Sequence, residues 1–139
     1  MDDLKLYMIL LGCKPVGRNT EQHDLFFGIG GSLKDIKNDI LDFWKEANGK
    51  IHIDGWREVN FVDGYQIKII DKKETDSGGN EKLFFINLGG YKPNEFEEFH
   101  YKVLTIATDK GFAIQKAKQT AFYKHTGFEG AVSISTELT

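Results

Sequence analysis

The chain has 139 residues but only one cysteine, two prolines and two arginines. A single cysteine cannot form an internal disulfide, and it excludes a zinc site built from several cysteines. Cys13 ends an apolar run, so we expect a buried, unreactive thiol. Because only Arg18 and Arg57 among the 18 basic residues are arginines, a surface that reads phosphates or bases bidentately would lack its usual residue.

Excess positive charge and long apolar runs are also missing. The net charge is −3, which argues against a nucleic-acid partner. The longest apolar run, Leu6–Leu11, is too short to cross a bilayer, and no basic segment followed by an apolar one marks a signal peptide at the start. We therefore expect a soluble, cytoplasmic, bacterial-type protein with no membrane partner.

Apolar residues are plentiful, at 40% hydrophobic and 13% aromatic. A chain of this length and composition can bury a core and is the size of one domain. We therefore expect a single domain over residues 1–139.

Two stretches of the chain are nearly the same. "KLYMILLGCKP" begins at Lys5 and "KLFFINLGGYKP" begins at Lys82, so that the only two prolines fall in matching places. Glu21-x-His23 then matches Glu98-x-His100. We interpret this as an internal duplication, with repeat 1 at about 5–71, a polar linker at about 72–81 and repeat 2 at about 82–139. Two such halves would bury their apolar faces against each other about a pseudo-twofold axis.

Each repeat has the pattern of two strands followed by a helix. In repeat 1 the apolar run and an alternating segment predict strands, and an apolar stripe after a Ser32–Asp35 capping box predicts a helix. Two more alternating segments around a hairpin signal at 62–64 predict further strands. Repeat 2 offers one short strand after its helix. The predicted fold is α+β, with two ββα(ββ) halves, a mostly antiparallel sheet and two helices. The predicted strands lie at 5–11, 23–29, 50–59, 65–70 and 131–135.

The Glu-x-His pairs are the first candidate site. Residues two apart on a strand share one face, so Glu21 with His23, and Glu98 with His100, each point together. Histidine and glutamate are metal ligands and acid–base partners, which makes His23 and His100 candidate metal ligands. The alternative is that each histidine hydrogen-bonds the backbone of the preceding Lys-Pro loop.

His52-x-Asp54 is the second candidate. Both side chains leave one strand face, and alternation places Trp56 further along that face. A ligand-binding surface and an ordinary exposed polar face are the two interpretations.

A glycine-rich stretch between a predicted strand and the first predicted helix is the third candidate. Its backbone N–H groups could hold an anion at the start of the helix. A turn that needs positive φ is the alternative. The residues of this weak anion site are Gly28, Gly30, Gly31 and Ser32.

Three stretches, "GCKPVGRNTEQHDLFFGIG", "GKIHIDGWREV" and "LFFINLGGYKPNEFEEFHYKVL", resemble a bacterial family of uncharacterised proteins known only as a domain of unknown function. The resemblance implies no activity. The family pattern places a second His-Ile-Asp after the second helix, whereas this chain has Ser133-Ile134-Ser135 there. This departure argues against two symmetric sites.

The sequence leaves two functions open. The first is a binding or assembly module without catalysis, which takes a small molecule or a protein and needs no cofactor. The second is a small enzyme, such as a metal-assisted hydrolase, with candidate catalytic residues Glu21, His23, His52, Asp54, Glu98 and His100. Because repeat 2 lacks a counterpart of the predicted 65–70 strand, we expect an open strand edge there, and either a homodimer or a C-terminal strand that is frayed or packed elsewhere.

Overall fold

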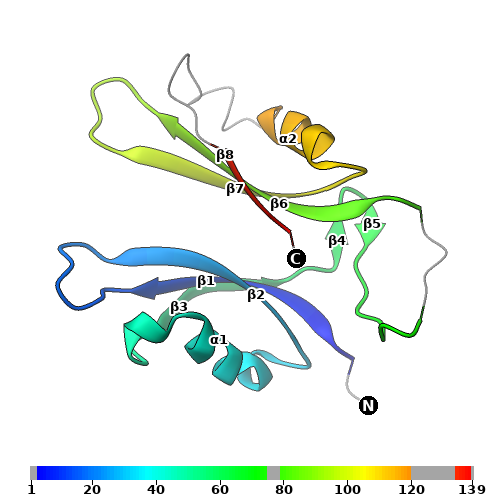
Figure 1. The fold of residues 1–139 in the computed structure, drawn as a ribbon, viewed down its shortest axis with the longest axis horizontal. Helices are drawn as coiled ribbons and strands as arrows, with labels where there is room; N and C mark the ends of the chain where they lie inside the picture. Colours follow the sequence, from blue (N-terminus) through cyan, green and yellow to red (C-terminus); the bar gives the residue numbers. More distant parts are fainter. Residues whose placement is uncertain (1–2, 75–78, 120–133, 139) are drawn as a thin grey trace. The chain divides into compact units, whose positions relative to one another are not determined.

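The computed structural model describes residues 3–74, 79–119 and 134–138, and it divides the chain into two compact units (Figure 1). Unit 1 comprises Met1–Phe61 with Gln66–Glu74, and unit 2 comprises Val62–Tyr65 with Thr75–Thr139. Each contains a three-stranded antiparallel sheet and an α-helix, so the α+β prediction is confirmed. No helix in the described ranges is long and apolar enough to cross a membrane.

The sheet of unit 1 is built around its first strand. β1 (Lys5–Cys13) lies between β2 (Gln22–Gly30) and β3 (His52–Glu58), and both pairings are antiparallel. Because side chains alternate along a strand, one face of β1 can carry an apolar set. This set packs against the helical segment. The buried residues of the core that they form together are Tyr7, Ile9 and Leu11 of β1 with Ile36 and Ile40 of the helical segment.

The helical segment of unit 1 is less regular than the single helix that the sequence predicts. It consists of a 3₁₀ turn η1 (Leu33–Ile36), the helix α1 (Lys37–Phe43) and a second 3₁₀ turn η2 (Lys45–Ala47). The predicted capping box is wrong, because the Ser32 side chain makes no capping hydrogen bond. In a capping box the Asp35 N–H would donate to the Ser32 side chain. It donates instead to the Ser32 carbonyl oxygen at 3.1 Å, which is the hydrogen bond that closes a 3₁₀ turn.

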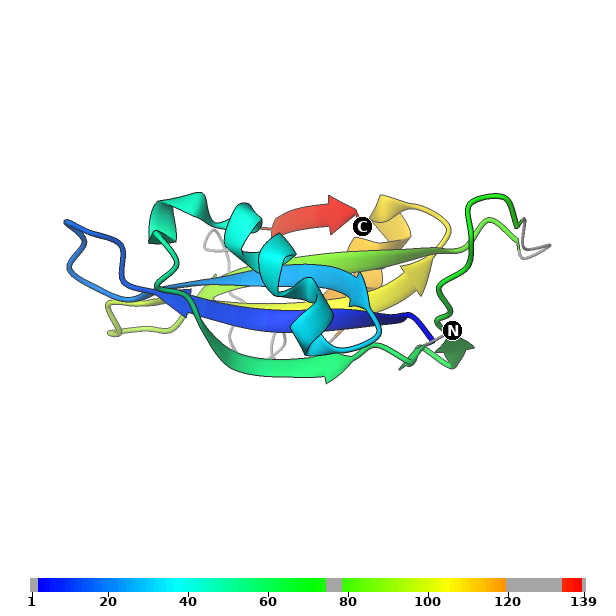
Figure 2. The same ribbon diagram turned by 90° about the horizontal axis from the view of Figure 1, so that it is seen from below.

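Gly28 and Gly30 lie inside β2 and do not form a turn. A Cβ added to Gly28 would lie 3.1 Å from Ile36 Cδ1, and one added to Gly30 would lie 2.9 Å from Ile36 Cγ2. The glycines therefore let η1 approach β2 closely, and Figure 2 shows the helical segment lying along this part of the sheet. Neither glycine has positive φ, so the turn interpretation is wrong. An anion site in this stretch stays a prediction.

Unit 2 has the same strand order as unit 1. β6 (Lys82–Tyr91) lies between β7 (Glu98–Ala107) and β8 (Ile134–Leu138), again antiparallel, and α2 (Lys110–Lys118) follows β7. Gly89 of β6 pairs with His100 of β7, as Gly12 of β1 pairs with His23 of β2. The duplication, the pseudo-twofold and the single-domain organisation stay predictions. Ala131–Ser133 of the predicted final strand lie outside the described residues, and β8 extends further along the chain than predicted.

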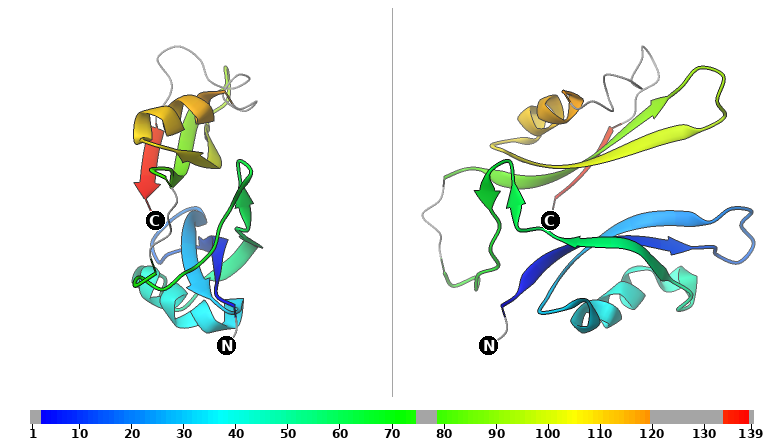
Figure 3. Two further views of the ribbon diagram at one scale, coloured as in Figure 1. Left: turned by 90° about the vertical axis from the view of Figure 1, so that its right-hand side faces the viewer. Right: turned by 180° about the vertical axis from the view of Figure 1, so that it is seen from behind.

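The predicted strand at 65–70 is wrong beyond its first two residues. The Asp63–Gly64 turn joins two short strands, β4 (Phe61–Val62) and β5 (Tyr65–Gln66). Both turn residues have positive φ, 52° and 82°, as a type I′ hairpin needs. The hairpin forms a two-stranded sheet of its own (green arrows in Figure 3). In the described residues the main sheets of the two units thus have three strands each, while repeat 1 has the hairpin strands β4 and β5 in addition.

Asp63, in the turn of this hairpin, makes its contacts within unit 2, to which Val62–Tyr65 belong. Its Oδ2 accepts hydrogen bonds from Thr105 Oγ1 at 2.7 Å, Ile106 N at 2.8 Å and Lys116 Nζ at 2.8 Å. Burial would raise the pKa of the Asp63 carboxyl, but these three donors outweigh it and lower the pKa below its usual value. One carboxylate therefore connects the hairpin to both β7 and α2.

We predict that Asp63→Asn lowers the free energy of unfolding by about 1–2 kcal/mol at neutral pH, because it removes a charged acceptor with three donors. Asparagine tolerates the positive φ of this position, so the backbone should not be strained. A lowered pKa stabilises the fold above the unfolded-state pKa, and this stabilisation is lost as pH falls through the folded-state value. Urea melts at pH 7 and at pH 3 measure both effects.

The control is Asp42→Asn on α1, which should change stability by less than about 0.5 kcal/mol. A D63N variant that keeps the stability of the parent protein at pH 7 would show that these contacts of Asp63 contribute nothing.

Candidate functional site: a histidine–carboxylate cluster around Gly12

Two of the predicted motifs meet on one face of the unit 1 sheet. Gly12 of β1 lies opposite His23 of β2 on one side and opposite His52 of β3 on the other. Residues directly opposite in a sheet share a face, so the antiparallel register brings both histidines to the same place. Glu21 precedes His23 by two residues and Asp54 follows His52 by two, and both carboxylates join them. We call Glu21, His23, His52 and Asp54 the Gly12 cluster.

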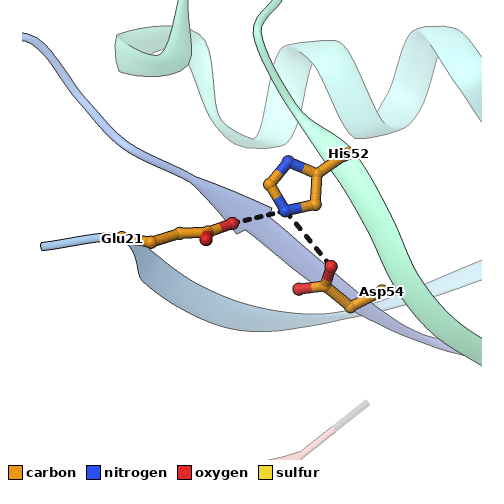
Figure 4. A group of neighbouring side chains, drawn as sticks. All are labelled: Glu21, His52 and Asp54. Carbon is orange, nitrogen blue, oxygen red and sulfur yellow. Dashed lines mark ion pairs between the residues drawn. The ribbon is translucent and has the colours of Figure 1, made fainter.

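The cluster is connected by short polar contacts. His52 Nε2 touches Glu21 Oε1 and lies 3.1 Å from Asp54 Oδ1 (Figure 4). His23 Nε2 lies 2.9 Å from the other Asp54 oxygen, Oδ2, and 4.0 Å from Glu21 Oε1. Both imidazole rings thus direct Nε2 towards the two carboxylates. The three side chains of Figure 4 can each offer one ligand atom within 4.8 Å of the others.

Gly12 provides the space in which these side chains meet. A Cβ at this position would lie 2.4 Å from His52 Nε2, 2.6 Å from Asp54 Oδ2 and 2.8 Å from Glu21 Oε1. Any larger residue would therefore occupy the point on which the donors converge. The predicted strand ends at residue 11, one residue before Gly12, although β1 continues through Gly12 to Cys13. The sequence contains a sign that the strand continues, because Gly12 is followed by Cys13, a residue that the sequence predicts to be buried.

A β-bulge brings Asp54 to the cluster. Leu11 pairs with Ile53 and Leu10 pairs with Gly55, so Asp54 is an extra residue in β3. Bulges redirect side chains and occur often beside functional sites. The bulge also reverses the alternation that follows it, and Trp56 pairs with Ile9 and contacts the Tyr7 ring with centroids 6.0 Å apart. The expectation that Trp56 shares the face of His52 is therefore wrong.

The matching pair in unit 2 has different surroundings. His100 Nε2 lies 3.0 Å from Glu98 Oε1, and a hydrogen bond to the Glu98 carboxylate raises the pKa of the Tyr91 hydroxyl. The neighbouring strand β8 pairs with β6 without a register shift and carries Ile134-Ser135 where β3 carries Ile53-Asp54. The structure thus places Glu98 and His100 in a separate unit from the Gly12 cluster.

The cluster faces solvent. Its side chains are between 31% and 52% exposed, so a ligand can reach the donor atoms without any opening of the fold. Cys13 next to Gly12 is a buried free thiol, as predicted.

We predict that Gly12→Ala moves the side chains of the Gly12 cluster away from one another and leaves the sheet folded. The new methyl group meets the exposed ends of flexible side chains, which can swing away, so the free energy of unfolding should change by less than about 1 kcal/mol. The side-chain NMR signals of His23 and His52 should shift. Gly55→Ala is the matched control, because a Cβ there meets nothing within 4 Å. Unchanged ring signals in G12A would contradict the geometry.

Comparisons with known proteins match the segment that contains the Gly12 cluster and the fold of the chain. The family model Domain of Unknown Function (DUF1543) matches residues 18–69, a range that contains all four residues of the Gly12 cluster, and the resemblance to a domain of unknown function is confirmed there. The crystal structure of a protein Il1583 from Idiomarina loihiensis has a similar fold, with a TM-score of 0.66 and 21% identity over 99% of this chain and 88% of that one. No curated protein matches the chain.

Proposed function

We propose that the Gly12 cluster binds a divalent transition-metal ion, of which zinc is the best representative, and that the protein acts as a metal-dependent binding module. The observation that carries the proposal is the convergence of the His52 imidazole and the carboxylates of Glu21 and Asp54 on the space that Gly12 leaves open, with the second imidazole nitrogen, His23 Nε2, 2.9 Å from Asp54 Oδ2. The ligands are Glu21, His23, His52 and Asp54.

The donor set suits this class of metal. Imidazole nitrogen and carboxylate oxygen both bind Zn²⁺ at about 2.0–2.2 Å in tetrahedral sites, which sets neighbouring ligand atoms about 3.3 Å apart. The distances of 2.9, 3.1 and 4.0 Å within the cluster lie around that value. Glu21, His52 and Asp54 offer ligand atoms within 4.8 Å of one another, and His23 would join them by a rotation of its side chain. The imidazoles favour zinc, nickel or iron over magnesium and calcium, which prefer oxygen alone.

Charge within the cluster also favours a cation. Two carboxylates crowd around His52 Nε2, and a ring nitrogen carries at most one proton to donate. A divalent ion bound at this point would neutralise both carboxylates and use the lone pairs of both neutral imidazoles. Because imidazole must be unprotonated to bind a metal, affinity should fall in acid.

Metal-assisted hydrolysis is the second candidate function. It is supported by the exposure of the cluster and by the group of three ligands Glu21, His52 and Asp54, since three protein ligands would leave the fourth position of a tetrahedral ion to a water molecule. A metal ion lowers the pKa of such a water and generates a nucleophile near neutral pH. Hydrolysis of p-nitrophenyl acetate or phosphate by zinc-loaded protein, lost in H52A, would favour this candidate.

We further propose a bacterial cytoplasmic setting and a homodimer. The resemblance to a bacterial family and the single buried cysteine support the setting.

The homodimer is supported by open strand edges. In the described strands the three-stranded sheets each end in two edges, β2 and β3 in unit 1 and β7 and β8 in unit 2, and open edges favour pairing between copies. Light scattering that gives the monomer mass at 100 µM, on the order of common assay concentrations, would contradict the dimer.

The metal proposal is tested by titrating the full-length protein with Co²⁺, whose visible absorption reports tetrahedral coordination, and by competition with Zn²⁺. His52→Ala and Asp54→Asn should each weaken Zn²⁺ binding by at least about 100-fold, because each removes a ligand. His100→Ala is the matched control, since it removes a Glu-x-His histidine of unit 2, and it should leave the affinity unchanged.

Two results would overturn the proposal. One is a parent protein that gives no tetrahedral Co²⁺ spectrum and binds no Zn²⁺ at micromolar concentration. The other is an equal loss of affinity in H100A and H52A, because a site at the Gly12 cluster does not depend on a histidine in the second unit.

A further inference from the structure

The opposite face of β3 borders an apolar groove. Its cavity volume is about 450 Å³, which lies within the range of roughly 300–1,000 Å³ typical of small-molecule sites. The groove lies between the helical segment and β3 within unit 1. Its lining residues are Leu33, Lys34, Lys37, Ile40, Leu41, Gly49, Ile51 and Ile53.

The packing of the helical segment explains why the groove exists. Gly28 and Gly30 let Ile36 approach β2 closely, which sets η1 over β2 at one side of the sheet. β3, on the other side of β1, is left partly uncovered, and Ile53 is 45% exposed although it points to the helical face. The Asn48–Gly49 turn, with φ of 52° and 77°, returns the chain to β3 and contributes Gly49 to the lining.

The charged residues of the helical segment that line the groove are all positive. The segment carries three lysines, of which Lys34 and Lys37 line the groove and Lys45 does not. It also carries four acidic residues, Asp35, Asp39, Asp42 and Glu46, and none of them lines the groove. Neither ammonium group has an ion-pair partner among the residues that the structure describes. An apolar floor thus lies beside two unpaired positive charges with no lining carboxylate to oppose them.

We propose that this groove binds a small amphipathic anion, a carboxylate attached to an apolar chain. The chain would cover Ile40, Leu41 and Ile53, and the carboxylate would lie at Lys34 and Lys37. Because His52 and Asp54 leave the other face of β3, the groove is separate from the Gly12 cluster, and it holds its ligand with or without metal.

The test is a titration of ¹⁵N-labelled, metal-free, full-length protein with octanoate, followed by NMR, with octanol as the neutral probe of equal chain length. Octanoate should shift the amide signals of Lys37, Gly49 and Ile53, and added salt should weaken its binding by screening the lysines. Octanol should bind at least fivefold more weakly. Octanol binding as tightly as octanoate, or shifts confined to other parts of the chain, would overturn the proposal.

Two double variants complete the test. Lys34→Gln with Lys37→Gln should weaken octanoate binding by roughly five- to tenfold, since each exposed charge contributes a modest attraction, and should leave octanol binding unchanged. Lys45→Gln with Lys50→Gln removes two neighbouring lysines that do not line the groove and should have no effect. Equal losses in the two double variants would reduce the result to general surface charge and contradict the proposal. The H52A variant should bind octanoate like the parent protein.

Discussion

The register of β1 between its two antiparallel neighbours is the constraint on which unit 1 depends. It sets Tyr7, Ile9 and Leu11 on the helical face, where they form the core with Ile36 and Ile40. A shift by one residue would exchange the two faces and expose that core. The same register brings Gly12 between His23 and His52, so the stability of the core and the geometry of the polar cluster are fixed together.

The bulge at Asp54 gives β3 two different surfaces. Before it, His52 and Ile53 alternate between the cluster and the groove. After it, the alternation reverses, and Trp56 moves to the face of Tyr7. One extra residue therefore adds a carboxylate to the cluster and an aromatic ring to the core face. β8 pairs with β6 without such a bulge, so unit 2 repeats the strand order without repeating the polar site.

The sequence predicted the local features well and the features that depend on pairing poorly. Apolar runs and alternation were sufficient for β1, β2 and the α+β class, and the Glu-x-His and His-x-Asp spacings identified all four residues of the cluster. That these two motifs meet at Gly12 follows from strand order, which no single strand encodes. The bulge is invisible to an alternation rule, so Trp56 was placed on the wrong face. The 65–70 segment alternates like a strand, but only Tyr65–Gln66 form one.

The hairpin that carries Asp63 makes the second unit depend on the first half of the chain. Residues 62–65 belong to unit 2, although the rest of its chain begins at Thr75. A gene fragment that encoded only the second repeat would lack the acceptor for Thr105, Ile106 and Lys116. During synthesis Asp63 leaves the ribosome before its three partners do, so these contacts join residues 42, 43 and 53 positions apart, and such distant contacts slow folding. The chain is therefore two compact units in space but cannot be divided into two by one cut in the sequence.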